Sequence, residues 1–275
     1  MNTPAVVAEN YISVGIGKVR LHSGKMFLLA VMAGAFIALA GIGSAAASCQ
    51  VTVPSVAKLI TACVFPGGLM MVLLAGSELF TGNCLLVIPL LSKKIKILEM
   101  LRNWGIVYAG NFVGAILVAA LTVFSHQLSS FSGAMAMSAL NTAIAKCSLT
   151  FGDAFLRGIA CNFLVCIAVW ISFAAKDVVG KIVGLYFPIL LFVISGFEHS
   201  IANMFYGPVG ILAKSVPEYA QLAADAGVDI SVLTWGNFLT QNLLPVTLGN
   251  IIGGLLVGTV YWCCYLNGKE ETKSH

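Results

Sequence analysis

The chain has 275 residues, of which 59% are hydrophobic and only 9% are charged, and its mean hydropathy is +0.96. Soluble domains carry about 25% charged residues, so this composition excludes a protein that covers itself with a hydrated surface and predicts an integral membrane protein. The net charge of +4 is small and gives no indication of a nucleic-acid partner.

Apolar runs of the length that crosses a bilayer, about 20 residues, follow one another along the chain. We expect six transmembrane helices, near residues 26–47, 58–91, 103–125, 154–175, 182–213 and 236–266. The second and fifth runs are too long for one straight span, and each contains a polar, glycine-containing interruption. Each is therefore expected to consist of a longer helix, a non-helical break and a half-helix, within an all-α membrane fold.

Lysine and arginine residues gather in alternate connections of this pattern, around residues 18–25, 93–102, 176–181 and 269–273. The positive-inside rule places these connections in the cytoplasm, so we expect a multi-pass protein of the cell membrane with both termini cytoplasmic. The chain is expected to be a single transmembrane domain (1–275). It divides into a cytoplasmic N-terminal segment (1–24), a first repeat (25–126), a second repeat (150–266) and a cytoplasmic tail (267–275).

The repeat is visible in the interrupted runs. The stretch Gly76-Ser-Glu-Leu-Phe-Thr-Gly-Asn83 recurs as Gly196-Phe-Glu-His-Ser-Ile-Ala-Asn203, with glycine, glutamate and asparagine matched at an offset of 120. A second echo matches Gly110–Gly114 with Gly249–Gly253 at an offset of 139. Three spans per half is an odd number, so the halves enter the membrane from opposite sides, as in an aquaporin-like inverted repeat. Such repeats place a shared site near the midplane.

Three ionisable residues lie at the interruptions of these runs: Glu78, Glu198 and His199. Ionisable groups inside a membrane are functional candidates by default. The glutamates occupy equivalent positions, so we expect them to hold the two breaks by accepting hydrogen bonds from free backbone N–H groups. The counterpart of His199 is Leu79, and an imidazole in water titrates near neutrality, with a pKa of about 6.5. A functional role for His199 is therefore favoured.

The hydroxyl residues Thr81 and Ser200 lie where the two half-helices are expected to begin. Ser200 is expected to be an N-cap, whereas Thr81 is either an N-cap or a hydroxyl that faces His199. The free N–H groups of two half-helix N-termini make the centre favourable for a small anion.

Lys146 lies on the side of the membrane that is poor in positive charge. A cation at an outer vestibule concentrates anions, so we expect Lys146 to do this. Arg157 and Asp153, one helical turn apart, are expected to pair with each other.

Four motifs, at residues 76–83, 161–166, 197–204 and 242–250, resemble those of the formate/nitrite transporter family. The resemblance runs from Gly24 to Leu266. It implies a homopentamer in which each aquaporin-like protomer has its own pore for small monovalent anions such as formate, nitrite and hydrosulfide, with protons coupled or co-transported. Neither break has the Asn-Pro-Ala signature of true aquaporins, which argues against a water or glycerol channel.

The resemblance also implies roles for individual residues. The central histidine falls on His199, its threonine partner on Thr81 and the vestibule lysine on Lys146, while Asn162 and Asn250 brace the broken loops. Apolar constrictions above and below the histidine fall on Phe65, Leu69, Leu79, Phe80, Val165 and Phe192.

A bare anion in a dry slit is costly, and desolvation raises the proton affinity of a weak-acid anion. We therefore expect the anion to be protonated transiently in the apolar constriction, with the proton supplied by His199 or by vestibule water. The motif at 197–205 favours formate, whereas the motif at 76–82 resembles nitrite- and hydrosulfide-type members. The expected partners are the anion, protons and the lipid bilayer; no nucleic acid, cofactor or metal is expected.

Two other classes of function stay open. An intramembrane enzyme would use Glu78, Glu198 and His199 as acid/base groups or metal ligands, although one histidine with two carboxylates is a poor zinc set and no nucleophile motif accompanies them. A membrane receptor that transports nothing would not need two broken helices. An enzyme is the less favoured interpretation.

Overall fold

Every regular element in residues 1–267, the part of the chain that the computed structural model describes, is a helix. Three helices are long, unbroken spans: α2 (Ser23–Ser48), α7 (Ile97–Phe124) and α9 (Phe151–Ala174). The all-α fold expected from the sequence is confirmed. Lys269 and Lys273, in the expected cytoplasmic tail, lie outside the described residues.

Five helical segments of residues 1–267 are long and apolar enough to cross a membrane. Besides the three unbroken spans, they are the pair α3 (Pro54–Val64) and α4 (Pro66–Leu74), and the run formed by α13 (Trp235–Asn237), η3 (Phe238–Leu243) and α14 (Leu244–Tyr265). The fifth expected span is divided between α10 (Val178–Ile194) and α11 (Ser200–Ala213), each too short to count alone. The count of six crossings therefore stays a prediction.

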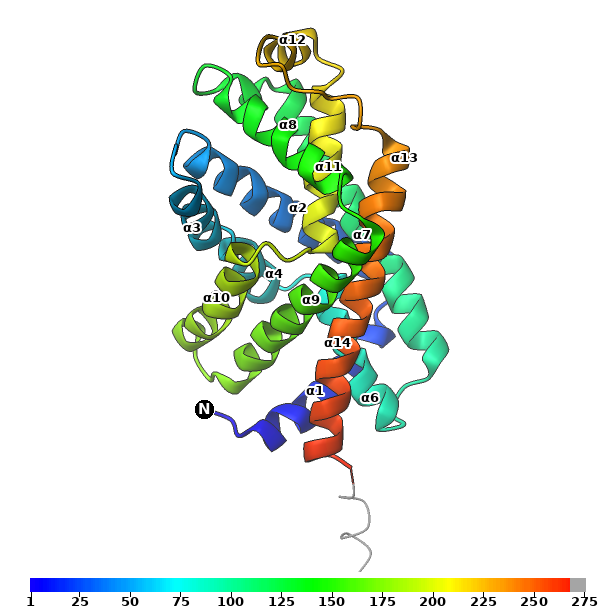
Figure 1. Ribbon diagram of the computed structural model, residues 1–275. Coiled ribbons are helices and arrows are strands. Elements are labelled where there is room, and N and C mark those ends of the chain that lie inside the picture. The colour runs from blue at the N-terminus through cyan, green and yellow to red at the C-terminus, as the bar shows by residue number, and fades with distance from the viewer. Residues whose placement is uncertain (268–275) are drawn as a thin grey trace, which may run out of the picture.

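Both expected breaks are present. The first separates α4 from α5 (Phe80–Asn83), which continues through η1 (Cys84–Leu86) into α6 (Val87–Leu91); the second separates α10 from α11. Each break begins at a glycine in the left-handed region, Gly76 at φ +79° and Gly196 at φ +72°, where a side chain would be strained. From the middle of the molecule the half-helices run in opposite directions, α5–α6 toward α1 (Pro4–Arg20) and α11 toward α8 (Ala134–Cys147) (Figure 1).

The long spans pack in equivalent pairs, α2 with α7 and α9 with α14. A Cβ on Gly114 would overlap the Val31 carbonyl oxygen, and a Cβ on Gly253 would overlap the Ile159 carbonyl oxygen. Val31 and Ile159 are related by an offset of 128, and the glycines by the offset of 139. The same close helix contact is thus built twice, at small residues that let the backbones approach.

The two ends of the molecule differ in their covering elements. The N-terminus and the last described turns of α14 lie at the end that carries α1 and α6, whereas α8 and α12 (Pro217–Asp225) lie at the opposite end (Figure 1).

The loop after α12 is ordered locally by Asp229, which accepts hydrogen bonds from the backbone N–H and the hydroxyl of Ser231 at 2.8 and 2.9 Å. These bonds hold the pKa of the Asp229 carboxyl below its usual value.

Candidate functional site

Two cavities enter the molecule from its opposite ends. The larger, of about 1000 Å³, is lined by residues of α2, α3, α8, α9, α10 and α11, and by Glu198 and His199 of the second break. It also contains Lys146, and we call it the Lys146 vestibule. The smaller, of about 510 Å³, lies between α1 and the first break and is lined by residues that include Lys18 and Glu78; we call it the Lys18 vestibule.

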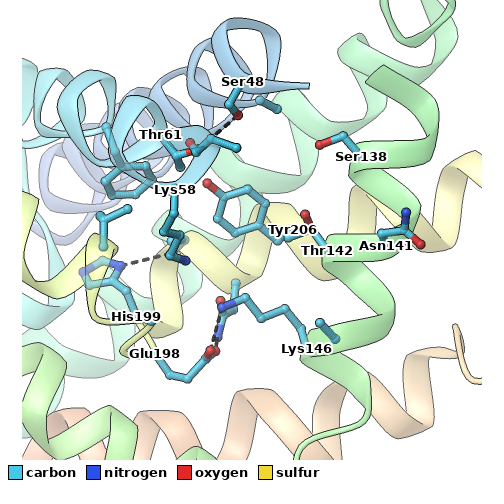
Figure 2. Close-up of a pocket in the computed structure, with 18 of the residues that line it drawn as sticks. Ser48, Lys58, Thr61, Ser138, Asn141, Thr142, Lys146, Glu198, His199 and Tyr206 are labelled. Carbon is cyan, nitrogen blue, oxygen red and sulfur yellow. Dashed lines mark hydrogen bonds and ion pairs between the residues drawn. The ribbon is translucent and has the colours of Figure 1, made fainter. Parts of the chain in front are cut away.

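Thr81 and His199 meet between the two vestibules. Thr81 lies in α5 and His199 directly precedes α11, so each half-helix brings one partner. The Thr81 Oγ1 and His199 Nε2 atoms are 3.0 Å apart, and His199 lines the Lys146 vestibule although only 3% of it is exposed (Figure 2). The structure therefore brings together the two residues that were predicted to face each other.

His199 also caps α11. Its Nδ1 atom accepts a hydrogen bond from the backbone N–H of Ala202 at 3.0 Å. The expectation that Ser200 provides this cap is wrong, because its buried Oγ has no partner among the described residues. The hydrogen-bond network assigns the ring proton to Nε2, which then donates to Thr81 Oγ1. A doubly protonated ring would need a second hydrogen on Nδ1 and would lose the cap.

Apolar side chains flank this contact on both sides. On the side of the Lys146 vestibule, the rings of Phe65 and Phe192 pack edge to face with centroids 5.8 Å apart, and Phe192 stacks on the His199 ring at 5.8 Å. On the other side, Leu69 and Leu79 line the Lys18 vestibule. The histidine thus lies between two apolar layers.

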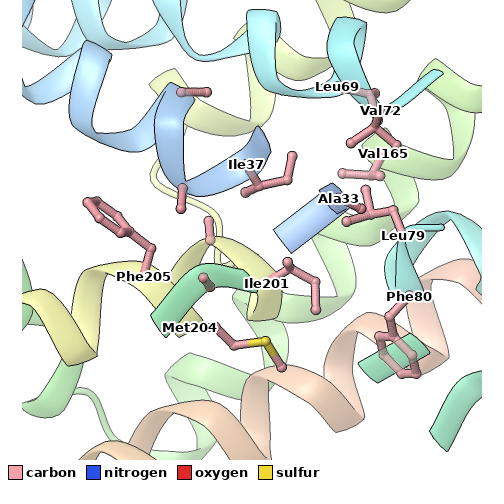
Figure 3. Packing of buried hydrophobic residues seen from close by; sticks show 14 of the residues in the cluster. Ala33, Ile37, Leu69, Val72, Leu79, Phe80, Val165, Ile201, Met204 and Phe205 are labelled. Carbon is pink, nitrogen blue, oxygen red and sulfur yellow. The ribbon is translucent and has the colours of Figure 1, made fainter. Parts of the chain in front are cut away.

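Of the other two predicted constriction residues, Val165 is buried and lies beside Leu79, whereas Phe80 points away from them (Figure 3). The Phe80 ring packs against Trp104 and Tyr108, with centroid distances of 5.9 and 4.9 Å, and lines neither vestibule. The structure therefore does not bring Phe80 to the predicted group.

Glu198 is held by three side chains. Its Oε1 accepts from Lys146 Nζ at 2.6 Å, and its Oε2 accepts from Asn203 at 2.7 Å and from Asn242 at 3.4 Å. The side chains of Glu198 and Lys146 are 4% and 18% exposed, so this ion pair is largely removed from solvent. The carboxylate braces the second break through these side chains, and not through the backbone N–H groups that the sequence led us to expect.

Glu78 has the same arrangement in the first half. Its Oε1 accepts from Lys18 Nζ at 2.8 Å and its Oε2 from Asn83 at 2.7 Å. Asn83 also donates to Asn103 at 2.9 Å, as Asn203 donates to Asn242 at 2.8 Å in the second half. Each break is thus tied by a lysine to the short helix that precedes its repeat, α1 or α8.

Asparagine side chains fix the backbone at both breaks. Asn250 donates to the carbonyl oxygens of Gly158 and Glu198 at 2.8 and 2.9 Å, and its Oδ1 accepts from the Ser200 N–H at 2.9 Å. Asn162 donates to the carbonyl oxygens of Thr81 and Asn250 at 3.2 and 2.7 Å. Asn162 thereby links the threonine of the first half-helix to the brace of the second break.

Asn111 is the equivalent of Asn250 in the first half. It donates to the carbonyl oxygens of Ala30 and Glu78 at 2.7 and 2.9 Å, and it accepts from the Phe80 N–H at 3.0 Å. Both N–H groups and the carbonyl oxygen of each side chain are therefore engaged, which is what burial of an amide in an apolar surrounding requires.

Several residues of this framework were not predicted from the sequence. Lys18 matches Lys146 at an offset of 128, and Asn103 matches Asn242 at an offset of 139. A search for repeated polar residues at these offsets, which the unbroken spans also follow, would have found them.

The local pair expected of Arg157 and Asp153 does not form within residues 1–267. Asp153 instead accepts from the Thr150 hydroxyl at 2.7 Å, and Arg157 lines the Lys146 vestibule.

Comparison with known proteins places this geometry in a family. A family model described as Formate/nitrite transporter matches residues 5–263. The formate channel FocA of Escherichia coli (strain K12) is 40% identical over 273 residues, which are 98% of this chain and 96% of the relative. A probable formate transporter of Methanothermobacter thermautotrophicus is 38% identical over 291 residues, covering 96% of this chain and 97% of the relative.

Solved structures agree with this. A pentameric formate channel with formate bound aligns with a TM-score of 0.79 at 37% identity, covering 89% of this chain and 98% of that chain. An FNT family ion channel aligns with a TM-score of 0.81 at 26% identity, covering 94% and 98% of the two chains.

Proposed function

The chain belongs to the formate/nitrite transporter family, and from this premise we propose that it transports small monovalent anions, with formate as its main substrate, across the cell membrane. The observation that carries the proposal is the contact of Thr81 with His199 between two vestibules that open at opposite ends. The relatives described as formate channels and the solved formate channel with formate bound support formate as the substrate.

The proposed path runs from one vestibule to the other past His199. An anion that leaves water for the apolar layers formed by Phe65, Phe192, Leu69 and Leu79 loses solvation, and a low dielectric strengthens every remaining charge interaction. The neutral His199 ring has one N–H, on Nε2, which donates to an oxygen of the passing substrate in place of Thr81.

Protonation removes the charge that makes passage costly. We propose that the anion takes up a proton from vestibule water as desolvation raises its proton affinity, crosses as the neutral acid, and releases the proton on the other side. His199 is a poor proton source, because its Nδ1 is engaged in capping α11. Its role is to orient the acid through Nε2.

The assembly and orientation are part of the proposal. A homopentamer is supported by the pentameric channel that aligns with nearly the whole chain, and each protomer would have its own path. The excess of lysine and arginine near α1 and after α6 supports a cytoplasmic location for that end, and the Lys146 vestibule would then face the outside.

A catalytic role is not part of the proposal. Glu78 and Glu198 are both engaged by a lysine and an asparagine, which supports a bracing role for the two carboxylates. The relatives are transporters and channels.

Flux of labelled formate into proteoliposomes tests the proposal. The wild-type protein should accelerate proton-coupled uptake, and His199→Phe should abolish or convert it, because phenylalanine has no donor at the position of Nε2. Competition among formate, nitrite, hydrosulfide and acetate identifies the preferred anion; a preference for nitrite or hydrosulfide, which the motif at 76–82 also resembles, would replace formate as the substrate. Uptake no faster than in empty liposomes would refute transport.

A further inference from the structure

The two vestibules differ in their charged lining. The charged residues that line the Lys18 vestibule are one cation and one anion, Lys18 and Glu78. The charged residues that line the Lys146 vestibule are three cations and one anion: Lys58, Lys146, Arg157 and Glu198. The formal charge of the lining, with His199 neutral, is therefore zero at one end and +2 at the other.

The excess charge does not come from Lys146. Its ammonium group lies 2.6 Å from Glu198 Oε1, just as Lys18 lies 2.8 Å from Glu78 Oε1 at the other end. At a distance of several ångströms each pair acts as a dipole, and its field falls off faster than that of a single charge. Lys146 and Lys18 therefore brace the breaks more than they attract distant anions.

Lys58 and Arg157 carry the uncompensated charge. Within residues 1–267 neither side chain forms an ion pair. Lys58 projects from α3 into the Lys146 vestibule, above His199 and on the opposite wall from Lys146 (Figure 2).

Arg157 is fixed relative to the second break, because its carbonyl oxygen accepts the Glu198 N–H at 3.3 Å. The equivalent carbonyl in the first half belongs to Leu29, at an offset of 128, which lines the Lys18 vestibule. The repeat has thus placed a cation at one end where it has an apolar side chain at the other.

We propose that Lys58, together with Arg157, forms an anion-capture site in the Lys146 vestibule, so that small anions are captured more efficiently from this end than from the Lys18 vestibule. The inference rests on the proposed function and deepens it. A lone cation in a partly enclosed cavity raises the local concentration of anions, and salt screens the effect. Loss of one unit charge about 8 Å from the anion, at an effective dielectric constant of about 40 to 80 in the water-filled vestibule, changes capture by about two- to six-fold.

Whole cells and inside-out membrane vesicles separate the two ends, since each preparation presents one vestibule to added formate. The host lacks formate channels of its own. We would measure the half-saturating concentration of labelled formate for the wild type, K58Q and K58R, at about 10 mM and about 300 mM ionic strength, where the Debye length falls from about 30 Å to under 8 Å. K181Q is the matched control, because Lys181 carries the same charge in α10 and lines neither vestibule.

We expect K58Q to raise the half-saturating concentration about two- to six-fold at low ionic strength, in one preparation only, and to resemble the wild type at high ionic strength. K58R and K181Q should resemble the wild type throughout. If K58Q does not reach the membrane, R157Q, which removes the other uncompensated charge, repeats the test.

The wild type could take up formate while K58Q leaves the half-saturating concentration unchanged, or changes it equally in both preparations. Either result would overturn the capture site and leave the transport function intact. Wild-type protein that carries no formate in either preparation would refute the proposed function and this inference with it.

Discussion

Thr81 Oγ1 and His199 Nε2 lie 3.0 Å apart although 118 residues separate them in the chain. The contact forms because Thr81 lies in the first turn of one half-helix and His199 directly precedes the other, and the two half-helices meet with opposite directions in the middle of the fold. His199 uses its other nitrogen to cap α11. One ring therefore couples the shape of the second break to the donor that faces the proposed path.

The two roles of His199 can be separated by substitution. His199→Asn keeps an oxygen that can accept the Ala202 N–H, whereas His199→Leu has no cap; loss of an N-cap costs about 1 kcal/mol. Both lack the Nε2 donor. We expect thermal unfolding in detergent to show a lower stability for His199→Leu alone, and labelled-formate flux to fall at least about tenfold in both, which corresponds to about 1.4 kcal/mol. Full flux in His199→Asn would show that the donor is dispensable.

The interaction between Lys146 and Glu198 should contribute to the free energy of unfolding, because both side chains are largely buried. Removing one partner, as in Glu198→Gln or Lys146→Met, leaves a buried charge uncompensated and should lower the free energy of unfolding by about 3 kcal/mol. The double variant should lose less than the sum, with a coupling energy of about 1–3 kcal/mol. Chemical denaturation of the four proteins measures it.

The pair Lys18–Glu78 allows the same cycle in the first half of the chain, since its geometry and exposure are similar. A coupling energy near zero in both halves would contradict a bracing role for these carboxylates.

Close packing of α2 against α7 can be tested at a single glycine. Gly114→Ala would push a methyl group into the Val31 carbonyl oxygen, and the helices would have to separate, at a cost of about 1–3 kcal/mol. Gly105→Ala, in the same helix, meets nothing within 4 Å and should be neutral or stabilise by up to about 1 kcal/mol. Equal melting temperatures for the two variants would argue against this contact.

The brace at the second break depends on the amide group of Asn250. Asn250→Asp cannot donate to the carbonyl oxygens of Gly158 and Glu198 when ionised, so two buried acceptors lose their donor, at about 1–3 kcal/mol each. We expect a large loss of stability. Because the break positions His199, the fraction of the variant that folds should also show a lower formate flux. Asn111→Asp should destabilise the first break by a similar amount. An Asn250→Asp variant with the stability and formate flux of the wild type would disprove the brace.

Much of the fold could be predicted from the sequence because it depends on local requirements. A composition with 9% charged residues needs a bilayer, and a left-handed residue at each break needs glycine, which Gly76 and Gly196 supply. The offset of 120 that relates Glu78 to Glu198 predicts two equivalent breaks without any knowledge of packing.

Only the tertiary structure decided which polar groups meet. A buried carboxylate, amide or imidazole without a hydrogen-bond partner is costly. Which partner it has depends on which distant segments come within hydrogen-bond reach after folding. Lys18 reaches Glu78 because α1 lies beneath the first break, His199 takes the cap expected of Ser200, and Phe80 turns toward Trp104. The sequence determined how many polar groups had to be satisfied in the membrane; the packing of the two inverted halves determined the pairs, because partners far apart in the chain are brought together only by the completed fold.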